Sequence, residues 1–163
     1  MLTAPLPAPA APLTELVSLV RTLAADPALW RPHVRFTASR HWSRLPSPDG
    51  VDVWLLTWLP AQGTDLHDHG SSAAALTVLA GQLDEVRATP DGALSRSRLG
   101  PGDTHWVAPG VVHDVENVGS TPAVSLHAYS PRLTRMTFWT PTAAGLRAVR
   151  TVATDEPELD GTR

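Results

Sequence analysis

The residues with the clearest chemical potential are two histidines, His67 and His69, at the start of the apolar run LHDHGSSAAALTVLAG. Successive side chains on a β-strand point to opposite faces, so residues i and i+2 share a face. Both imidazoles can therefore reach one metal ion. A second segment, GDTHWVAPGVVHDVENVG, supplies His113 within another Gly- and Val-rich strand pattern. We predict that these three histidines ligate a metal. Imidazole binds zinc, iron, copper and nickel, so the ligands alone do not name it.

Five other polar residues are expected to stay outside the chemistry. His33, His41 and His105 lack a comparable context in the sequence. Asp68 and Asp114 each follow a predicted ligand by one residue, so on a strand they point to the opposite face. We expect these two carboxylates to be solvated on the outer face, with orientation of a neighbouring ligand as the alternative.

A second constellation lies in the string SLHAYSP, where Ser125, His127 and Tyr129 alternate with two apolar residues and share one strand face. If that face is interior, the three groups must hydrogen-bond to one another, because a buried group left unpaired costs about 1–3 kcal/mol. They would then present a phenol to the cavity. The alternative is a polar outer face, with Leu126 and Ala128 packed inside. No nucleophile-elbow sequence accompanies the serine, which argues against a serine hydrolase.

One helix and a series of short strands must position these groups. Apolar residues recur at helical spacing from Leu13 to Ala24, and with Thr14 as the expected N-cap they predict a helix over residues 14–25. From Arg40 onward, short runs such as VDVWLLTWL and PAVSLHAYS are separated by turn signals such as SPDG and GPGD. Several short strands at such spacing predict an all-β sandwich or barrel.

The length of 163 residues indicates one domain with its own core. We expect this domain to span residues 13–150. The Pro/Ala-rich segment 1–12 and the polar tail 151–163 are expected to be flexible.

Composition excludes several classes of protein. The net charge is −3 and the thirteen basic residues, all arginine, are scattered, so no nucleic-acid-binding stripe is indicated. The absence of cysteine excludes disulfides, thiolate metal sites and cysteine nucleophiles. The sequence contains neither a signal-peptide pattern nor an apolar run of about 18 residues. We therefore expect a soluble cytoplasmic protein, monomeric or a small homo-oligomer, that binds no membrane.

Residues 40–140 resemble the cupin superfamily and, within it, the bacterial cysteine dioxygenase (thiol dioxygenase) family. The resemblance lies in WLPAQGTDLHDHGSS, VLAGQL, VHDVENVG and, most specifically, SLHAYSP. It implies an all-β cupin jelly-roll barrel, Fe(II) held by the three histidines, and a Ser125–His127–Tyr129 relay beside the iron. It also implies an upstream arginine that binds the substrate carboxylate. Arg44 is the best match, and Arg40 is the reserve.

The implied activity is the oxidation of L-cysteine by O2 to cysteine sulfinic acid, and two departures from the wider pattern refine it. General cupins carry a glutamate ligand shortly after the histidine pair, where this chain has Ala73 and Ala74. This difference favours a three-histidine site. Animal members of the family cross-link a cysteine at the position of Ala74 to the relay tyrosine, so here Tyr129 must be a free phenol. Trp42 replaces another tyrosine of the animal proteins.

Three other functions remain open from the sequence. A dioxygenase for 3-mercaptopropionate or another small thiol would need the same sulfur and carboxylate contacts. A zinc or nickel cupin enzyme would use the histidines without the relay. A non-catalytic cupin would bind a small ligand without consuming oxygen.

Overall fold

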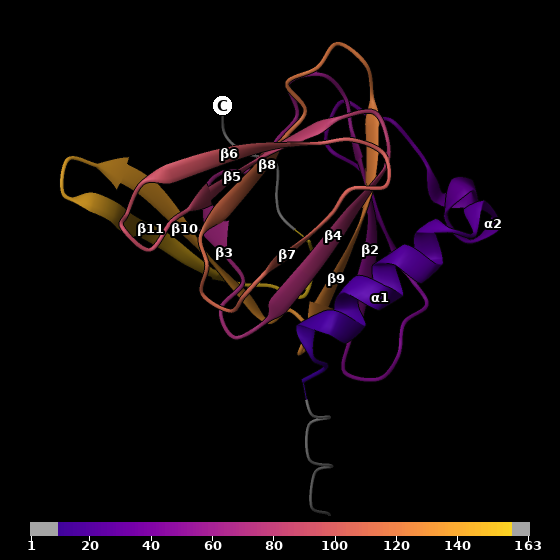
Figure 1. Cartoon of the computed structure of the whole chain (residues 1–163), viewed down its shortest axis with the longest axis horizontal. Helices are drawn as coiled ribbons and strands as arrows, with labels where there is room; N and C mark the ends of the chain where they lie inside the picture. The colour runs from indigo at the N-terminus through magenta and orange to yellow at the C-terminus, as the bar shows by residue number, and fades with distance from the viewer. Residues whose placement is uncertain (1–9, 158–163) are drawn as a thin grey trace, which may run out of the picture.

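The computed structural model describes residues 10–157 and contains two antiparallel β-sheets with two short helices on one side (Figure 1). Of the segments predicted to be flexible, 1–12 and 151–163, residues 1–9 and 158–163 lie outside the described residues, and residues 151–153 complete the last strand. No helix of the described part could cross a membrane.

Along the sequence, the helices precede the strands. The helices are α1 (Leu13–Ala24) and α2 (Pro27–Trp30), followed by one 3-10 turn (Arg31–His33). The strands are β1 (Trp42–Leu45), β2 (Asp52–Trp58), β3 (His67–Asp68), β4 (Ala73–Ala80), β5 (Leu83–Ala88), β6 (Leu94–Leu99), β7 (Thr104–Val107), β8 (His113–Glu116), β9 (Ala123–Ser130), β10 (Arg135–Thr142) and β11 (Gly145–Ala153).

One sheet has the strand order β1-β2-β9-β4-β7, and the other has the order β11-β10-β3-β8-β5-β6. The order departs repeatedly from chain order: β2 pairs with β9, β9 with β4, and β3 with both β8 and β10. The hairpin of β10 and β11 projects from one side of the barrel, whereas α1 crosses the opposite side (Figure 1). The predicted all-β barrel with a short N-terminal helix is confirmed.

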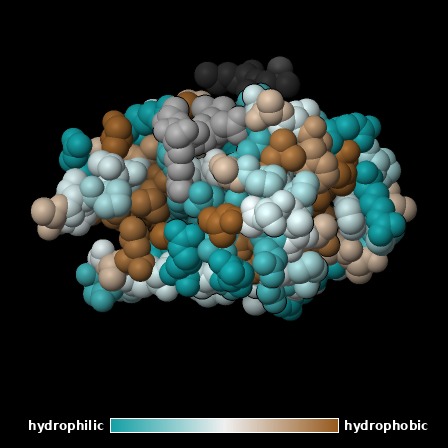
Figure 2. Space-filling view, turned by 90° about the horizontal axis from the view of Figure 1, so that it is seen from above, coloured by the Kyte–Doolittle hydropathy of each residue, from teal (hydrophilic) through white to brown (hydrophobic). Residues whose placement is uncertain are grey.

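Strands β2 and β9 are buried along their whole length because both faces of their sheet are covered. One face lines the barrel interior, where Trp54, Leu56 and Trp58 belong to the larger apolar cluster. The other face lies beneath α1, where Leu126 and Ala128 pack in a second cluster with Leu16 and Val20 of the helix, among others. The barrel therefore has a core on each side of this sheet. Exposed hydrophobic side chains form separate patches among hydrophilic ones on the face that Figure 2 shows.

The start of α1 differs from the sequence prediction. The helix begins at Leu13 with Pro12 at the N-cap, and no side chain caps it. The carbonyl oxygen of Pro12 accepts from the backbone N–H groups of Glu15 and Leu16. Thr14 is therefore inside the first turn and exposed, and the prediction that it caps the helix is wrong. Proline at this position is compatible with its fixed φ of −57°.

Packing against the sheet, and not capping by Thr14, should stabilise α1. We expect Leu16→Ala to lower the free energy of unfolding by about 2–5 kcal/mol, because the Leu16 side chain is only 1% exposed and its removal leaves a cavity. Thr14→Ala is the control and should change stability by less than about 0.5 kcal/mol. Urea denaturation followed by circular dichroism measures both. A loss of about 1 kcal/mol or more in Thr14→Ala would restore the capping role.

Candidate functional site

Three buried histidines converge in the barrel interior. Nε2 of His69 lies 3.1 Å from Nε2 of His67 and 3.3 Å from Nε2 of His113. His67 and His113 are directly opposite each other in the β3–β8 pair, and His69 follows β3 by one residue. One nitrogen of each ring lies within 4.8 Å of the other two, and no carboxylate belongs to this group among the described residues. The geometry allows all three imidazoles to face one ion.

Hydrogen bonds at the far ring nitrogens prepare two of these imidazoles for a metal. Nδ1 of His67 lies 2.7 Å from the backbone carbonyl oxygen of Asp65, which can only accept, so Nδ1 carries the proton and Nε2 keeps its lone pair. Burial lowers the pKa of His113 to about 4, so this ring is neutral at pH 7. Neutral imidazole is the form that binds metal. The donor set therefore fits a divalent ion that accepts nitrogen ligands.

A buried glutamate on β5 adjoins this group. One carboxylate oxygen of Glu85 lies 2.9 Å from Nδ1 of His113, and the other lies 2.7 Å from Nδ1 of His105. Arg87 donates from Nη2 to both oxygens, at 2.9 and 3.1 Å. Burial by itself would raise the pKa of Glu85, but the hydrogen bonds from His113 and His105 and the charge of Arg87 lower it to about 2. Glu85 is therefore an anion at pH 7.

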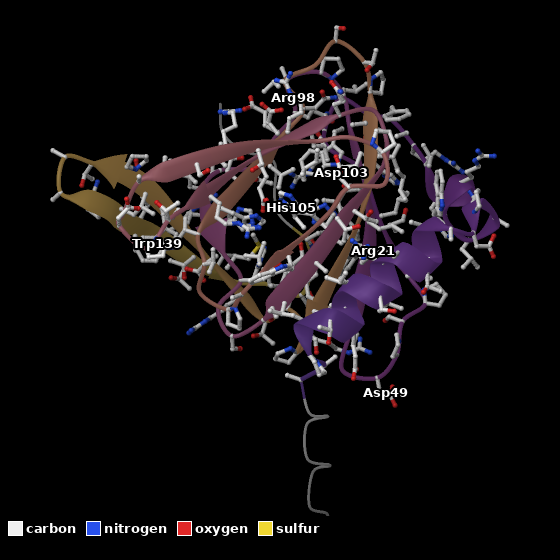
Figure 3. All side chains as sticks on the ribbon, viewed as in Figure 1. Arg21, Asp49, Arg98, Asp103, His105 and Trp139 are labelled. Atoms are coloured by element: carbon white, nitrogen blue, oxygen red, sulfur yellow. The ribbon has the colours of Figure 1, made fainter. Side chains whose placement is uncertain are left out.

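Sequence reasoning missed Glu85 and left His105 without a role. The available signal was period 2 in LDEVRA, which places Glu85 on the same strand face as the buried Leu83. A carboxylate at an inward position requires partners, because an unpaired buried charge is costly. His105 on β7 lies directly opposite Leu76 on β4, and opposite residues share a face of the sheet. Because Leu76 packs in the barrel interior, the side chain of His105 also faces the interior, and Figure 3 shows it between the two sheets.

The strand face of Ser125, His127 and Tyr129 is the interior one. Trp58 donates from Nε1 to the hydroxyl of Ser125 at 2.9 Å, and this hydroxyl lies 2.9 Å from Nε2 of His127. The rings of His127 and Tyr129 are stacked with centroids 6.5 Å apart, and the ring of Tyr129 meets His69 at 4.9 Å. A continuous row of polar side chains thus runs from Trp58 to the histidine group, and the alternative of a polar outer face is wrong.

The profile of the family "Cysteine dioxygenase type I" matches residues 8–140. The chain belongs to this family. Cysteine dioxygenase type 1 of Homo sapiens is 30% identical over an alignment of 128 positions, and the match covers 72% of this chain and 64% of the human protein. Cysteine dioxygenase type 1 of Danio rerio is 29% identical over an alignment of 152 positions, and the match covers 77% of this chain and 76% of the fish protein. The matched region is thus less than two thirds of the human relative's length.

Solved structures agree with this chain in fold. A conserved protein with a double-stranded β-helix domain from Klebsiella pneumoniae superposes with a TM-score of 0.54 at 20% identity, over 74% of this chain and 93% of its own. An oxalate oxidase superposes with a TM-score of 0.55 at 18% identity, over 61% of this chain and 54% of its own. At these identities the likeness extends to the fold alone. The resemblance to the cysteine dioxygenase family and the cupin barrel predicted from the sequence are both confirmed.

The two arginines considered for the substrate carboxylate of a cysteine dioxygenase lie near opposite ends of the row formed by Trp58, Ser125, His127 and Tyr129. Arg44 stacks over Trp54 at 4.3 Å and lies 4.0 Å from a carboxylate oxygen of Asp52, the residue opposite Tyr129 in the β2–β9 pair. Its side chain is 43% exposed. Arg40 is buried over the ring of Trp58, which binds the far end of the row. Register sets Arg44 opposite Trp54, in line with His127, and its proximity to Asp52 brings the guanidinium toward the Tyr129 end of the row.

The two aspartates beside the histidines are buried, so the expectation that they are solvated is wrong. Asp68 accepts from Nε1 of Trp139 at 2.8 Å and from the backbone N–H of Gly70 at 2.7 Å. Asp114 accepts from the hydroxyl of Thr64 at 3.1 Å. Both carboxylates do point away from the barrel interior, as predicted, but other groups cover that side. Asp68 thereby fixes the short segment that carries both histidines of the pair.

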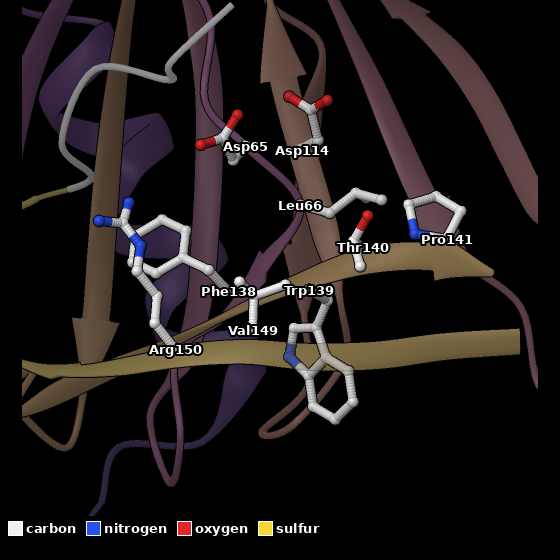
Figure 4. A pocket seen from close by; sticks show the side chains of 9 residues that line it. All are labelled: Asp65, Leu66, Asp114, Phe138, Trp139, Thr140, Pro141, Val149 and Arg150. Carbon is white, nitrogen blue, oxygen red and sulfur yellow. The ribbon is translucent and has the colours of Figure 1, made fainter.

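A hollow of about 380 Å³ lies on the outer side of the same sheet, against the β10–β11 hairpin (Figure 4). Asp65 and Asp114 line it together with apolar hairpin residues and Arg150. Because Asp114 and His113 are successive residues of β8, this hollow and the histidine group lie on opposite faces of the strand. Phe138 borders both, because it lines the hollow and its ring lies 6.1 Å from that of His67.

Proposed function

We propose that this chain is an iron-dependent thiol dioxygenase that oxidises L-cysteine to cysteine sulfinic acid with O2. Membership of the cysteine dioxygenase family supports a thiol and O2 as substrates. The observation that carries the proposal is the juxtaposition of two groups: three buried histidines without a carboxylate among them, and the Ser125–His127–Tyr129 row that meets them at His69.

His67, His69 and His113 would hold the metal through Nε2. Fe(II) bound there supplies the redox chemistry that joins O2 to sulfur. Because imidazole binds a metal in its neutral form, these ligands would leave the charge of a divalent ion uncompensated, and an anionic thiolate suits such a site. Zinc or nickel could bind the same nitrogens, but neither would make use of the polar row on β9.

The remaining residues bind and orient the substrate. Arg44 offers a planar guanidinium that can form two parallel hydrogen bonds to a carboxylate. Its stacking on Trp54 at 4.3 Å restricts the plane of that fork. Tyr129, fully buried beside His69, can donate its phenolic hydrogen to the substrate carboxylate or to an oxygen atom during the reaction. The hydrogen bonds that link Trp58, Ser125 and His127 fix the side chains that share the strand face of Tyr129.

The experiment that tests the proposal measures oxygen uptake by the iron-loaded protein. We expect consumption of O2 with L-cysteine and formation of cysteine sulfinic acid, identified by mass spectrometry. Cysteamine and 3-mercaptopropionate complete the substrate panel. His67→Ala should lose both iron and turnover, whereas His33→Ala, on the 3-10 turn, should retain both. Faster turnover of 3-mercaptopropionate than of cysteine would identify 3-mercaptopropionate as the preferred substrate in place of cysteine. No oxygen uptake with any of the three thiols would contradict the proposal.

The phenol of Tyr129 should contribute to turnover without contributing to metal binding. Tyr129→Phe keeps the ring beside His69 and removes the hydroxyl alone. We expect an unchanged iron content and a kcat lowered by roughly 10- to 1000-fold, the range for loss of a hydrogen-bond donor that acts in the transition state. Steady-state oxygen uptake and metal analysis of the same preparation provide the two readouts. A kcat equal to that of the wild type would make the role of the hydroxyl purely structural.

Recognition of the carboxylate should depend on Arg44. We expect Arg44→Ala to raise the KM for cysteine by roughly 10- to 30-fold, at or below the low end for a charge pair because the side chain is 43% exposed. Cysteamine lacks the carboxylate, so its kinetics should be insensitive to the substitution. If the cysteine KM is unchanged in Arg44→Ala and raised in Arg40→Ala, the role belongs to Arg40.

A further inference from the structure

We propose that Glu85 is a positioning residue for the metal site: its carboxylate fixes the imidazole of His113 and places an anionic charge directly behind this ligand. The inference rests on the proposed function, because it takes His113 as a metal ligand. It assigns a role to a residue outside the histidine group and outside the relay row, and it identifies His105 and Arg87 as the groups that hold Glu85 in place.

The contact between Glu85 and His113 has the geometry of an orienting hydrogen bond. The carboxylate oxygen lies 2.9 Å from Nδ1, and the two side chains are 2% and 1% exposed. Because the carboxylate can only accept, Nδ1 carries the proton and Nε2, which faces the other histidines, keeps its lone pair. The same bond fixes the rotation of the ring. An imidazole that donates to an anion is also a stronger electron donor at its other nitrogen.

Glu85 is itself held from two further sides. Arg87 donates to both carboxylate oxygens and stands directly opposite His113 in the β5–β8 pair. His105 adds a 2.7 Å contact from β7, which belongs to the other sheet. The carboxylate therefore cannot turn away from His113 without losing contacts to both neighbours. A side chain that served only to fill the core would not need a fixed orientation on three sides.

The charges also suit this role. Imidazole ligands bind a metal in their neutral form and so add no negative charge to a bound dication, and no carboxylate belongs to the group of three histidines among the described residues. Glu85 supplies an anion one ring away from the ion. Such partners of a histidine ligand change metal affinity by about 10- to 100-fold when they are removed. The affinity for a metal ion is therefore the property that separates a positioning role from a purely structural one.

The test measures Co(II) binding to the metal-free protein by competition with a chromophoric chelator, so no turnover is needed. Glu85→Gln keeps the shape of the side chain and removes its charge. We expect its Kd for Co(II) to be about 10- to 100-fold above that of the wild type. Asp84→Asn is the matched control. Asp84 is the preceding residue of β5, is also buried, and pairs with Arg96 and Arg98 on the opposite strand face. Its Kd should stay within about twofold of the wild type.

Each outcome separates the inference from the proposed function. Equal affinities of Glu85→Gln, Asp84→Asn and the wild type would overturn the role of Glu85 while leaving the metal site intact. A wild type that binds no Co(II), and is indistinguishable from His67→Ala, would overturn the proposed function and the inference with it. Urea denaturation of each metal-free variant is measured in parallel, so that a loss of affinity in a folded variant is not confused with unfolding.

A second variant applies if Glu85→Gln does not fold. His105→Ala leaves the Glu85 charge in place and removes one of the side chains that bond to the Glu85 carboxylate. The His105 side chain is 34% exposed, so the fold should tolerate the change. We expect Co(II) affinity to fall by roughly two- to tenfold, less than for loss of the carboxylate. His41→Ala is the control for His105→Ala, because the ring of His41 contacts Ser43 and not Glu85. An unchanged affinity in His105→Ala would then overturn the inference.

Discussion

The barrel interior at this site holds several polar side chains out of water, and the hydrogen bonding of these groups governs the packing around them. A buried polar group without a partner costs about 1–3 kcal/mol. Nδ1 of His67 meets a backbone carbonyl, Nδ1 of His113 meets Glu85, and the hydroxyl of Ser125 bonds to both Trp58 and His127. These bonds leave the Nε2 atoms of His67 and His113 directed at a common point, where a metal ion can satisfy them together.

Strand register decides which groups fill this interior. The pair of His67 and His113 is a single register position between β3 and β8, and Arg87 lies opposite His113 on the other side of β8. A slip by one residue would turn the whole set to the outer face. Strand β3 is only two residues long, and it pairs with β10 on one side and β8 on the other. The bond from Nε1 of Trp139 to Asp68 adds a further restraint between this segment and the β10–β11 hairpin.

The two sheets divide the chemistry between them. The six-stranded sheet carries His67 and His113 on β3 and β8, and Glu85 on β5. The five-stranded sheet carries the Ser125–His127–Tyr129 row on β9. Besides the shared apolar core, the sheets contact each other where Tyr129 meets His69 and where His105 lies 2.7 Å from Glu85. The position of the phenol relative to the histidine group is thus set by how the sheets pack, and not by either sheet alone.

Local spacing in the sequence was enough for the features that lie within a single strand or one residue beyond it. The period of two in a strand predicted that His67 and His69 turn the same way, and both rings face the site although His69 lies one residue past β3. The same argument put Ser125, His127 and Tyr129 together. Local spacing also predicts the helix near residue 13. The N-cap predicted at Thr14 is wrong, because a threonine before an apolar run has the same pattern whether or not its side chain bonds to the backbone. The motifs were specific enough to indicate the family.

Contacts between strands required the tertiary structure. The sequence left open which face of β9 is interior, because apolar neighbours bury both faces of that strand. It gave no sign that Asp68 is covered, since Trp139 is 71 residues away along the chain. Glu85 gained its role from partners 20 and 28 residues distant. The sequence by itself determined which side chains share a strand face, because that depends on backbone geometry over two residues. Only the folded chain decided which of these faces meet, because register and sheet packing depend on the whole barrel.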